Sequence, residues 1–232
     1  MSLDAELALR QVEAGNQAYR AGDYGGAIAR YEAALEAGAD GADLWFNLGN
    51  ALYRAGDHGR AVLAFERTLR RSPGDEGARE NLQLIRSQRA EGAPAPAEPL
   101  LVRIGSSVDP DAAAALLVVG WSLACVAWVV RRGASAAALR IGATVALGVL
   151  LLATLAAGAA AWATWQVRHD GWAVVVEPGP VLHAPEPNAP ELLVADEGLK
   201  VRSDRRIGGY AHVRVGDRAG WIESTRIESI DP

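Results

Sequence analysis

Residues that could carry out chemistry are few in this 232-residue chain, and they stand far apart in the sequence. The four histidines, at positions 58, 169, 183 and 212, belong to no metal-binding motif and to no serine or cysteine signature. The single cysteine, Cys125, lies in an apolar stretch and has no second cysteine to pair with. A glycine-rich phosphate loop is absent as well. The sequence therefore predicts a protein that is not an enzyme and that needs no catalytic residue, metal or cofactor.

The charge balance excludes another class of function. Lys and Arg number 23 against 28 Asp and Glu, which gives a net charge of −5 at pH 7. Proteins that bind nucleic acid usually present a basic patch, and an acidic chain offers no such electrostatic footprint. We therefore expect no nucleic-acid partner.

Polar and aromatic residues recur instead with a period of 34 residues. Gly15, Asn16, Tyr19 and Arg20 fall on Gly49, Asn50, Tyr53 and Arg54, and the residues at 21–23 fall on the identical residues at 55–57. A fixed period of this length is the signature of helical repeats that stack into an array.

Each repeat reads as two helices joined by a short turn. Apolar positions recur at helical spacing from Trp45 to Tyr53, and Gly56 with Asp57 provides a helix end followed by a helix cap. A second helix, at about 59–71, buries Ala61, Phe65 and Leu69, and Pro73 ends it.

This pattern resembles the tetratricopeptide (TPR) family, whose signature positions hold Trp45, Leu48, Gly49, Ala61, Phe65 and Pro73. The resemblance defines a TPR domain at 1–90, with repeats at about 8–41 and 42–75 and a closing helix at 76–90. The first repeat departs from the pattern, because Val12 and Ala14 replace larger residues and Ala39 stands where proline is usual.

The resemblance also implies where a partner binds. In this family the first helix of each hairpin lines a concave groove, which here assigns Asn16, Tyr19, Arg20, Phe46, Asn50, Tyr53 and Arg54 to the groove. Asparagine side chains can hydrogen-bond a peptide backbone, and arginines can pair with an acidic partner. The alternative for Tyr19 and Tyr53 is simple packing between the repeats.

The middle of the chain is apolar. A proline-rich linker at 91–110 precedes two segments, 111–132 and 141–167, that contain the uncharged runs 112–130 and 141–165. Runs of this length suffice to cross a hydrocarbon core of about 30 Å, so we expect two transmembrane helices joined by an arginine-rich loop at 133–140.

The arginines of that loop predict the topology. By the positive-inside rule the loop lies in the cytoplasm of a bacterium, which places the protein in the inner membrane and both polar domains in the periplasm. Export of the N-terminal domain needs a signal sequence, and the residues at 1–4 do not begin one. We therefore expect an upstream segment; the alternative is a cytoplasmic N-terminus.

The tail at 171–232 changes to a strand pattern. Five short strands, at about 173–176, 191–194, 199–201, 210–215 and 220–222, predict a small all-β barrel. The segments Gly208-Gly209-Tyr210 and Gly220-Trp221-Ile222 resemble a bacterial SH3-like domain, although the region at 181–185 departs from its pattern. Tyr210 and Trp221 can form an aromatic platform for a peptide or a cell-wall stem peptide; the alternative is that Trp221 is a core residue.

The predicted fold is thus a multi-domain membrane protein with all-α TPR hairpins, a two-helix transmembrane hairpin and an SH3-like barrel. This order of parts resembles the BatE-like TPR proteins of bacterial aerotolerance (Bat) operons. The resemblance implies a scaffold in a membrane complex with von Willebrand A-domain proteins and a MoxR-type AAA+ ATPase, with a role in aerotolerance or stress resistance. A second hypothesis is a protein that binds or senses peptidoglycan through its SH3-like domain.

Overall fold

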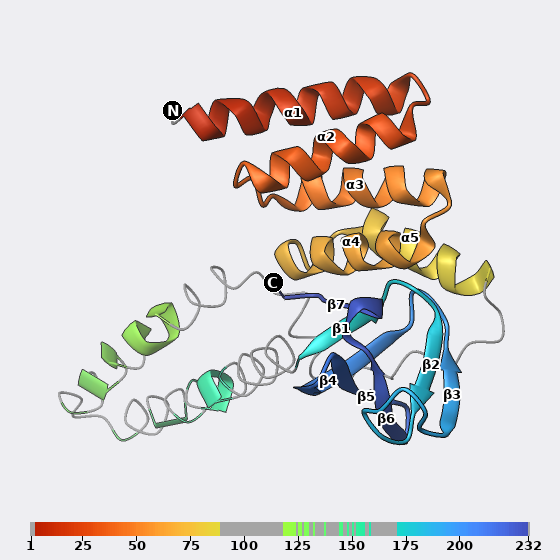
Figure 1. Ribbon diagram of the computed structural model, residues 1–232. Coiled ribbons are helices and arrows are strands. Elements are labelled where there is room, and N and C mark those ends of the chain that lie inside the picture. The colour runs from red at the N-terminus through yellow and green to blue at the C-terminus, as the bar shows by residue number, and fades with distance from the viewer. Residues whose placement is uncertain are drawn as a thin grey trace. The chain divides into compact units, whose positions relative to one another are not determined.

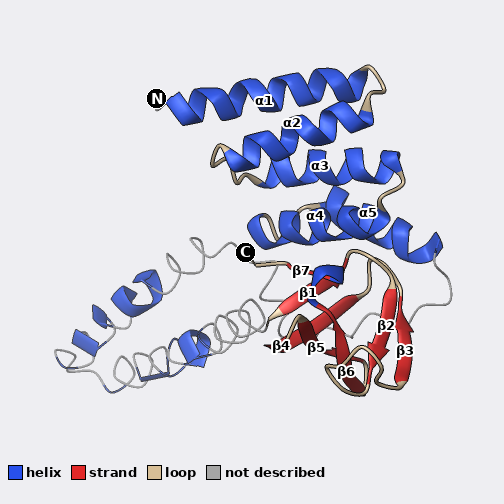
Figure 2. Ribbon diagram, viewed as in Figure 1, coloured by secondary structure: helices blue, strands red, loops and turns tan. Residues whose placement is uncertain are grey.

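The computed structural model describes residues 3–88, residues 171–231 and scattered positions between 118 and 158 (Figure 1). Its N-terminal part consists of five helices: α1 (Leu3–Arg20), α2 (Tyr24–Glu36), α3 (Ala42–Ala55), α4 (His58–Arg71) and α5 (Glu76–Gln88). The C-terminal part is an antiparallel sheet with one short 3-10 helix, η1 (Ser224–Arg226), between its last two strands (Figure 2). Both parts belong to one compact unit, which is made of Met1–Ala97 and Arg168–Pro232.

The two helical hairpins turn in the same way because the sequence at their turns repeats. Gly22 and Gly56 adopt φ values of 81° and 87°, a left-handed conformation that glycine allows without steric cost. Asp23 and Asp57 follow, and each carboxylate accepts a hydrogen bond from the backbone N–H three residues on, at 2.8 and 3.1 Å. Each aspartate thus caps the second helix of its hairpin.

Inside each hairpin an aromatic ring packs directly on a glycine of the first helix. A Cβ on Gly15 would lie 2.6 Å from a ring carbon of Tyr31, and a Cβ on Gly49 would lie 2.8 Å from a ring carbon of Phe65. Both rings are fully buried. The glycines therefore let the two helices approach, and the aromatic residues fill the space between them.

Helix α5 packs on α4 and buries three apolar residues, Ala78, Leu82 and Ile85. Its start is fixed by Asp75, whose carboxylate accepts a hydrogen bond from the N–H of Ala78 at 2.8 Å. These three side chains extend the hydrophobic core of the second repeat to a fifth helix.

The sheet has seven strands: β1 (Trp172–Val175), β2 (Gly179–Leu182), β3 (Glu191–Ala195), β4 (Lys200–Ile207), β5 (Tyr210–Val215), β6 (Arg218–Glu223) and β7 (Ile227–Ser229). Their order is β3-β2-β6-β5-β4-β1-β7. The expected strands correspond to β1, β3, β4, β5 and β6, whereas β2 and β7 were not expected. Strand β2 contains Pro180 and β7 has only three residues, so neither shows a strand pattern in the sequence.

Strand β1 is buried on both of its faces. Ala173 and Val175 belong to the core of the sheet, and Val174 belongs to the core of the helical repeats, with Trp172 and Val176 packed against the same helical core. The alternation of side chains along a strand explains this division. The run of apolar residues from 172 to 176 thus reflects two different hydrophobic neighbours.

The predicted membrane hairpin needs correction. Among the residues that the structure describes, no helix combines the length and the apolar character needed to cross a membrane. This finding contradicts the expected transmembrane helices at 111–132 and 141–167, and with them the membrane fold class, the inner-membrane location and the periplasmic placement. Most of both ranges, and the whole linker at 91–110, lie outside the described residues.

The contact between Gly49 and Phe65 leads to a first prediction. A Gly49→Ala substitution gains about 1 kcal/mol of helix propensity, but it forces a methyl group into the ring of Phe65, and overpacking of this kind costs about 1–3 kcal/mol. We expect a lower free energy of unfolding, measured by chemical denaturation of the full chain. In a Phe65→Leu background, which removes the ring, the same substitution should become neutral or stabilising. An equal loss in both backgrounds would contradict this explanation.

Candidate functional site

A shallow cavity of about 100 Å³ lies between the first three helices. It is lined by residues of α1, α2 and α3: Asn16, Tyr19, Arg20, Tyr31, Asn47 and Asn50. Four of the seven residues predicted to form a binding groove are therefore brought together here. Tyr31 and Asn47 were not predicted as site residues. They lie 15 and 31 residues from Asn16 in the sequence, and both separations are shorter than one 34-residue repeat.

The asparagines of the cavity form hydrogen bonds that repeat from one helical hairpin to the next. The side-chain amide of Asn47 donates to Oδ1 of Asn16 at 3.4 Å, and that of Asn81 donates to Oδ1 of Asn50 at 3.0 Å. Both bonds span 31 residues, so they are the same contact displaced by one 34-residue period. Among the described residues, the side-chain nitrogens of Asn16 and Asn50 have no acceptor. We call these repeated bonds the asparagine ladder. It leaves the side-chain N–H groups of Asn16 and Asn50 unused.

Tyr31 is the fully buried residue among those that line the cavity. Its hydroxyl donates to Oδ1 of Asn16 at 2.8 Å, so this oxygen accepts from both Tyr31 and Asn47. Burial raises the pKa of Tyr31 above its ordinary value, and the nearby Tyr19 acts in the same direction, whereas Arg20 opposes the shift. Tyr31 therefore stays a neutral hydrogen-bond donor that holds Asn16 in place.

Several arginines of the helices pair with carboxylates, whereas Arg30 and Arg79 donate to a side-chain amide and to a backbone carbonyl. Arg60 pairs with Glu32, Arg67 with Glu228 and Arg86 with Glu66. Arg20 and Arg54, by contrast, are exposed and have no carboxylate partner among the described residues. Two cations next to the asparagine ladder are thus available for a negatively charged group from another molecule.

The remaining predicted groove residues take part in packing. The ring of Phe46 meets that of Phe65 edge-on, with centroids 5.9 Å apart, and Tyr53 lies 5.4 Å from the ring of His58. The hydroxyl of Tyr53 accepts a hydrogen bond from the side-chain amide of Gln88 at 3.1 Å. Both aromatic residues are half-buried, so they link neighbouring helices and also retain some exposed surface.

The predicted aromatic platform lies on the sheet. Tyr210 on β5 and Trp221 on β6 are both half-buried, so Trp221 is not a core residue. The ring of Trp221 lies 5.0 Å from that of His212, whose Nδ1 is 2.7 Å from a carboxylate oxygen of Asp204. This hydrogen bond lowers the pKa of Asp204. The sheet thus presents a polar and aromatic surface of its own.

Metal chemistry has no support in the described part of the chain. No group of three or more His, Cys, Asp or Glu side chains there is arranged to hold an ion. His183 is exposed and His58 is packed against Tyr53, and neither is joined to a second metal-ligating side chain.

The environment of Tyr31 predicts a specific pH dependence of stability. The pKa of Tyr31 is raised in the folded protein, so its contribution is fully present below the ordinary pKa of 10.0 and is lost as the pH rises toward the folded value. At neutral pH, Tyr31→Phe should lower the free energy of unfolding by about 0.5–1.5 kcal/mol through the lost hydrogen bond. Denaturation at increasing pH should show the wild-type advantage shrinking above about pH 10. A constant advantage would contradict the assigned burial.

Comparison with known proteins agrees with the geometry of the helical part. The tetratricopeptide repeat family model matches residues 12–76, which include both capped turns and both glycine–aromatic contacts. A search among curated proteins finds no match for the chain. The family match covers well under half of the sequence, and it supports the TPR part of the predicted resemblance but not the Bat family. Residues 12–76 are thus similar to tetratricopeptide repeats, a typically non-catalytic scaffold for protein–protein interaction.

Proposed function

We propose that this protein is an adaptor whose helical groove binds an extended, acidic segment of a partner protein. The proposal rests on one observation, which is the pairing of a repeated asparagine ladder with two arginines that lack a carboxylate partner in the described residues. An extended backbone presents carbonyl acceptors at regular intervals, and the side-chain N–H groups of Asn16 and Asn50 can donate to them. Arg20 and Arg54 can bind carboxylates of the partner segment.

The resemblance to Bat-operon TPR proteins suggests which partners to test. Von Willebrand A-domain proteins and components of a MoxR-type AAA+ ATPase system are candidates, in a complex that serves aerotolerance or stress resistance. This part of the proposal rests on the sequence resemblance alone, and of that resemblance only the TPR part is supported by the family match.

The proposal is tested by selecting short peptides from a random displayed library on the full-length protein. We expect enrichment of extended sequences that contain Asp or Glu. Arg20→Gln should weaken the selected peptides about tenfold, because a hydrogen bond to a charged group contributes about 1.5–3 kcal/mol and each 1.4 kcal/mol is tenfold in affinity. The measurement is isothermal titration calorimetry.

Arg30→Gln is the matched control. Arg30 lies on α2, outside the cavity, and its guanidinium donates to the side chain of Gln11. Affinity should therefore be unchanged in this variant. Selection of peptides without acidic residues, or equal weakening by the two substitutions, would refute the acidic-groove proposal.

The sheet carries the second candidate function, which is recognition of a peptidoglycan stem peptide. Half-buried Tyr210 and Trp221 on neighbouring strands favour it, since aromatic surfaces of this kind bind extended peptides. Co-sedimentation of the full chain with purified peptidoglycan tests it. Trp221→Ala should reduce the bound fraction, whereas Arg20→Gln should not. Retention that is independent of Trp221 would exclude this surface.

A further inference from the structure

Helix α4 carries a stripe of residues that faces the sheet. Gly59, Leu63, Arg67 and Arg70 follow one another at intervals of four, four and three, which places them along one side of a helix. We call this set, together with the adjacent Glu66, the docking stripe. Its first three members are buried, and Arg70 and Glu66 make ion pairs with residues of the tail.

The apolar part of this contact is continuous with the core of the repeats. Val174 of β1 and Ile230 at the end of the tail are both fully buried, and both belong to the hydrophobic cluster that contains Leu63 and Phe65. A strand and a chain end from the C-terminal part thus complete a core that begins in the helices. Separation of the two parts would expose this apolar surface to water.

At Gly59 the helix and the strand segment meet backbone to backbone. A Cβ at this position would lie 2.5 Å from the carbonyl oxygen of Val176, so no larger residue fits. The equivalent position of the first repeat is Gly25, 34 residues earlier, where a Cβ would meet only a carboxylate oxygen of Asp23 at 4.0 Å. The repeat sequence places glycine at both positions, but only Gly59 has a neighbour that requires it.

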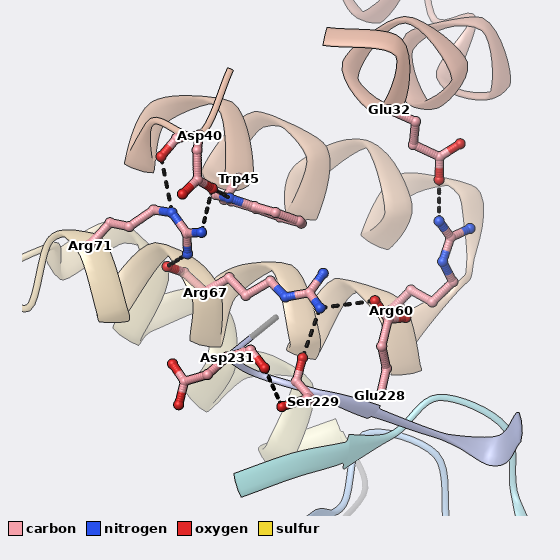
Figure 3. Close-up of polar contacts among 9 residues, drawn as sticks. All are labelled: Glu32, Asp40, Trp45, Arg60, Arg67, Arg71, Glu228, Ser229 and Asp231. Atoms are coloured by element: carbon pink, nitrogen blue, oxygen red, sulfur yellow. Dashed lines mark hydrogen bonds and ion pairs between the residues drawn. The ribbon is translucent and has the colours of Figure 1, made fainter. Parts of the chain in front are cut away.

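Arg67 crosses the interface as a nearly buried cation, with 7% of its surface exposed. Its guanidinium donates to the carboxylate of Glu228 at 2.9 Å and to the backbone carbonyl of Ser229 at 2.7 Å (Figure 3). It also lies over the ring of Trp45, 4.6 Å from the centroid. A buried arginine without a partner is strongly destabilising, and two of these three partners come from β7.

Charges on the two sides of the interface are complementary. Glu66 of α4 is buried and accepts from the amino group of Lys200 at 2.8 Å and from Arg86 of α5 at 3.0 Å. Arg70 pairs with Asp231 at 3.1 Å. The helix thus contributes two cations and one anion, and each of them forms an ion pair with an oppositely charged residue of the tail.

From this surface we infer that the docking stripe is a permanent binding site for the protein's own β sheet, which caps the repeat array at its C-terminal end. In arrays of helical hairpins each unit is covered by the next, and the last one requires a cap. Here α5 and the sheet together cover α4. The groove cavity is lined from α1, α2 and α3, so the cap leaves it open for a partner.

Lys200 is the only lysine of the chain, and this makes docking measurable. Its amino group is held by Glu66 and lies 5.2 Å from the centroid of the Trp172 ring. In the full-length wild-type protein, an amine-reactive ester should therefore acylate Lys200 much more slowly than in the same protein unfolded in denaturant, as measured by mass spectrometry. A Gly59→Leu substitution should raise the Lys200 rate several-fold, and the matched Gly25→Leu variant should leave it at the wild-type value.

Glu228→Arg tests the same contact without changing the helices. Glu228 is half-exposed on a three-residue strand, and its substitution by arginine places two cations together at Arg67. We expect faster acylation of Lys200 again, with circular dichroism as the check on helix content. A loss of helical signal in this variant also supports capping, because residue 228 lies outside the helices. Wild-type acylation rates in both Gly59→Leu and Glu228→Arg, with helix content preserved, would overturn the inference.

Discussion

Helix α4 is buried on two opposite sides, and the rest of this unit depends on that constraint. One side of the helix carries Ala61 and Phe65 into the hairpin with α3, where the ring of Phe65 needs the missing side chain of Gly49. The side that carries the docking stripe meets β1 and the C-terminal segment. A helix of 14 residues with eight buried positions in succession cannot be stable alone in water, because its apolar and charged groups both require partners. The helical repeats and the sheet each supply part of that environment.

The sequence predicts the repeat part well because its determinants are local. The 34-residue period locates the turns at Gly22 and Gly56, and the aspartates that follow them predict the caps. The resemblance to the TPR family predicts Asn16 and Asn50 as groove residues, and both form the repeated hydrogen bonds. The hydrogen bonds of Asn47 and Asn81 could not be predicted in this way, because they depend on how one repeat is rotated against the next. The period itself does offer a signal, since Asn47 and Asn81 are also 34 residues apart.

Contacts between the helices and the sheet lie beyond what pattern analysis can reach. The apolar run at 172–176 indicates a strand with two buried faces, but it does not say that one face meets α4. In the sequence, Arg67 and Glu66 resemble ordinary charged residues of a helix surface, and their partners in the tail are more than 130 residues away. The uncharged runs in the middle of the chain led to a wrong prediction, whereas the contacts of Arg67 and Glu66 were not predicted at all. Length and apolar composition predicted membrane helices there, and the described residues contain none that qualifies.

The arginines of the helices differ in their partners and in their exposure. Arg60, Arg67 and Arg86 connect elements of the unit and have carboxylate partners within it. Arg20 lines the cavity with Asn16 and Asn50, Arg54 is exposed at the equivalent position of α3, and neither has a carboxylate partner among the described residues. An exposed guanidinium needs no partner to remain stable in water, so these two positions carry little cost for folding. They remain available for the recognition proposed above, whereas Arg67 is buried and is held by Glu228 and Ser229 of β7.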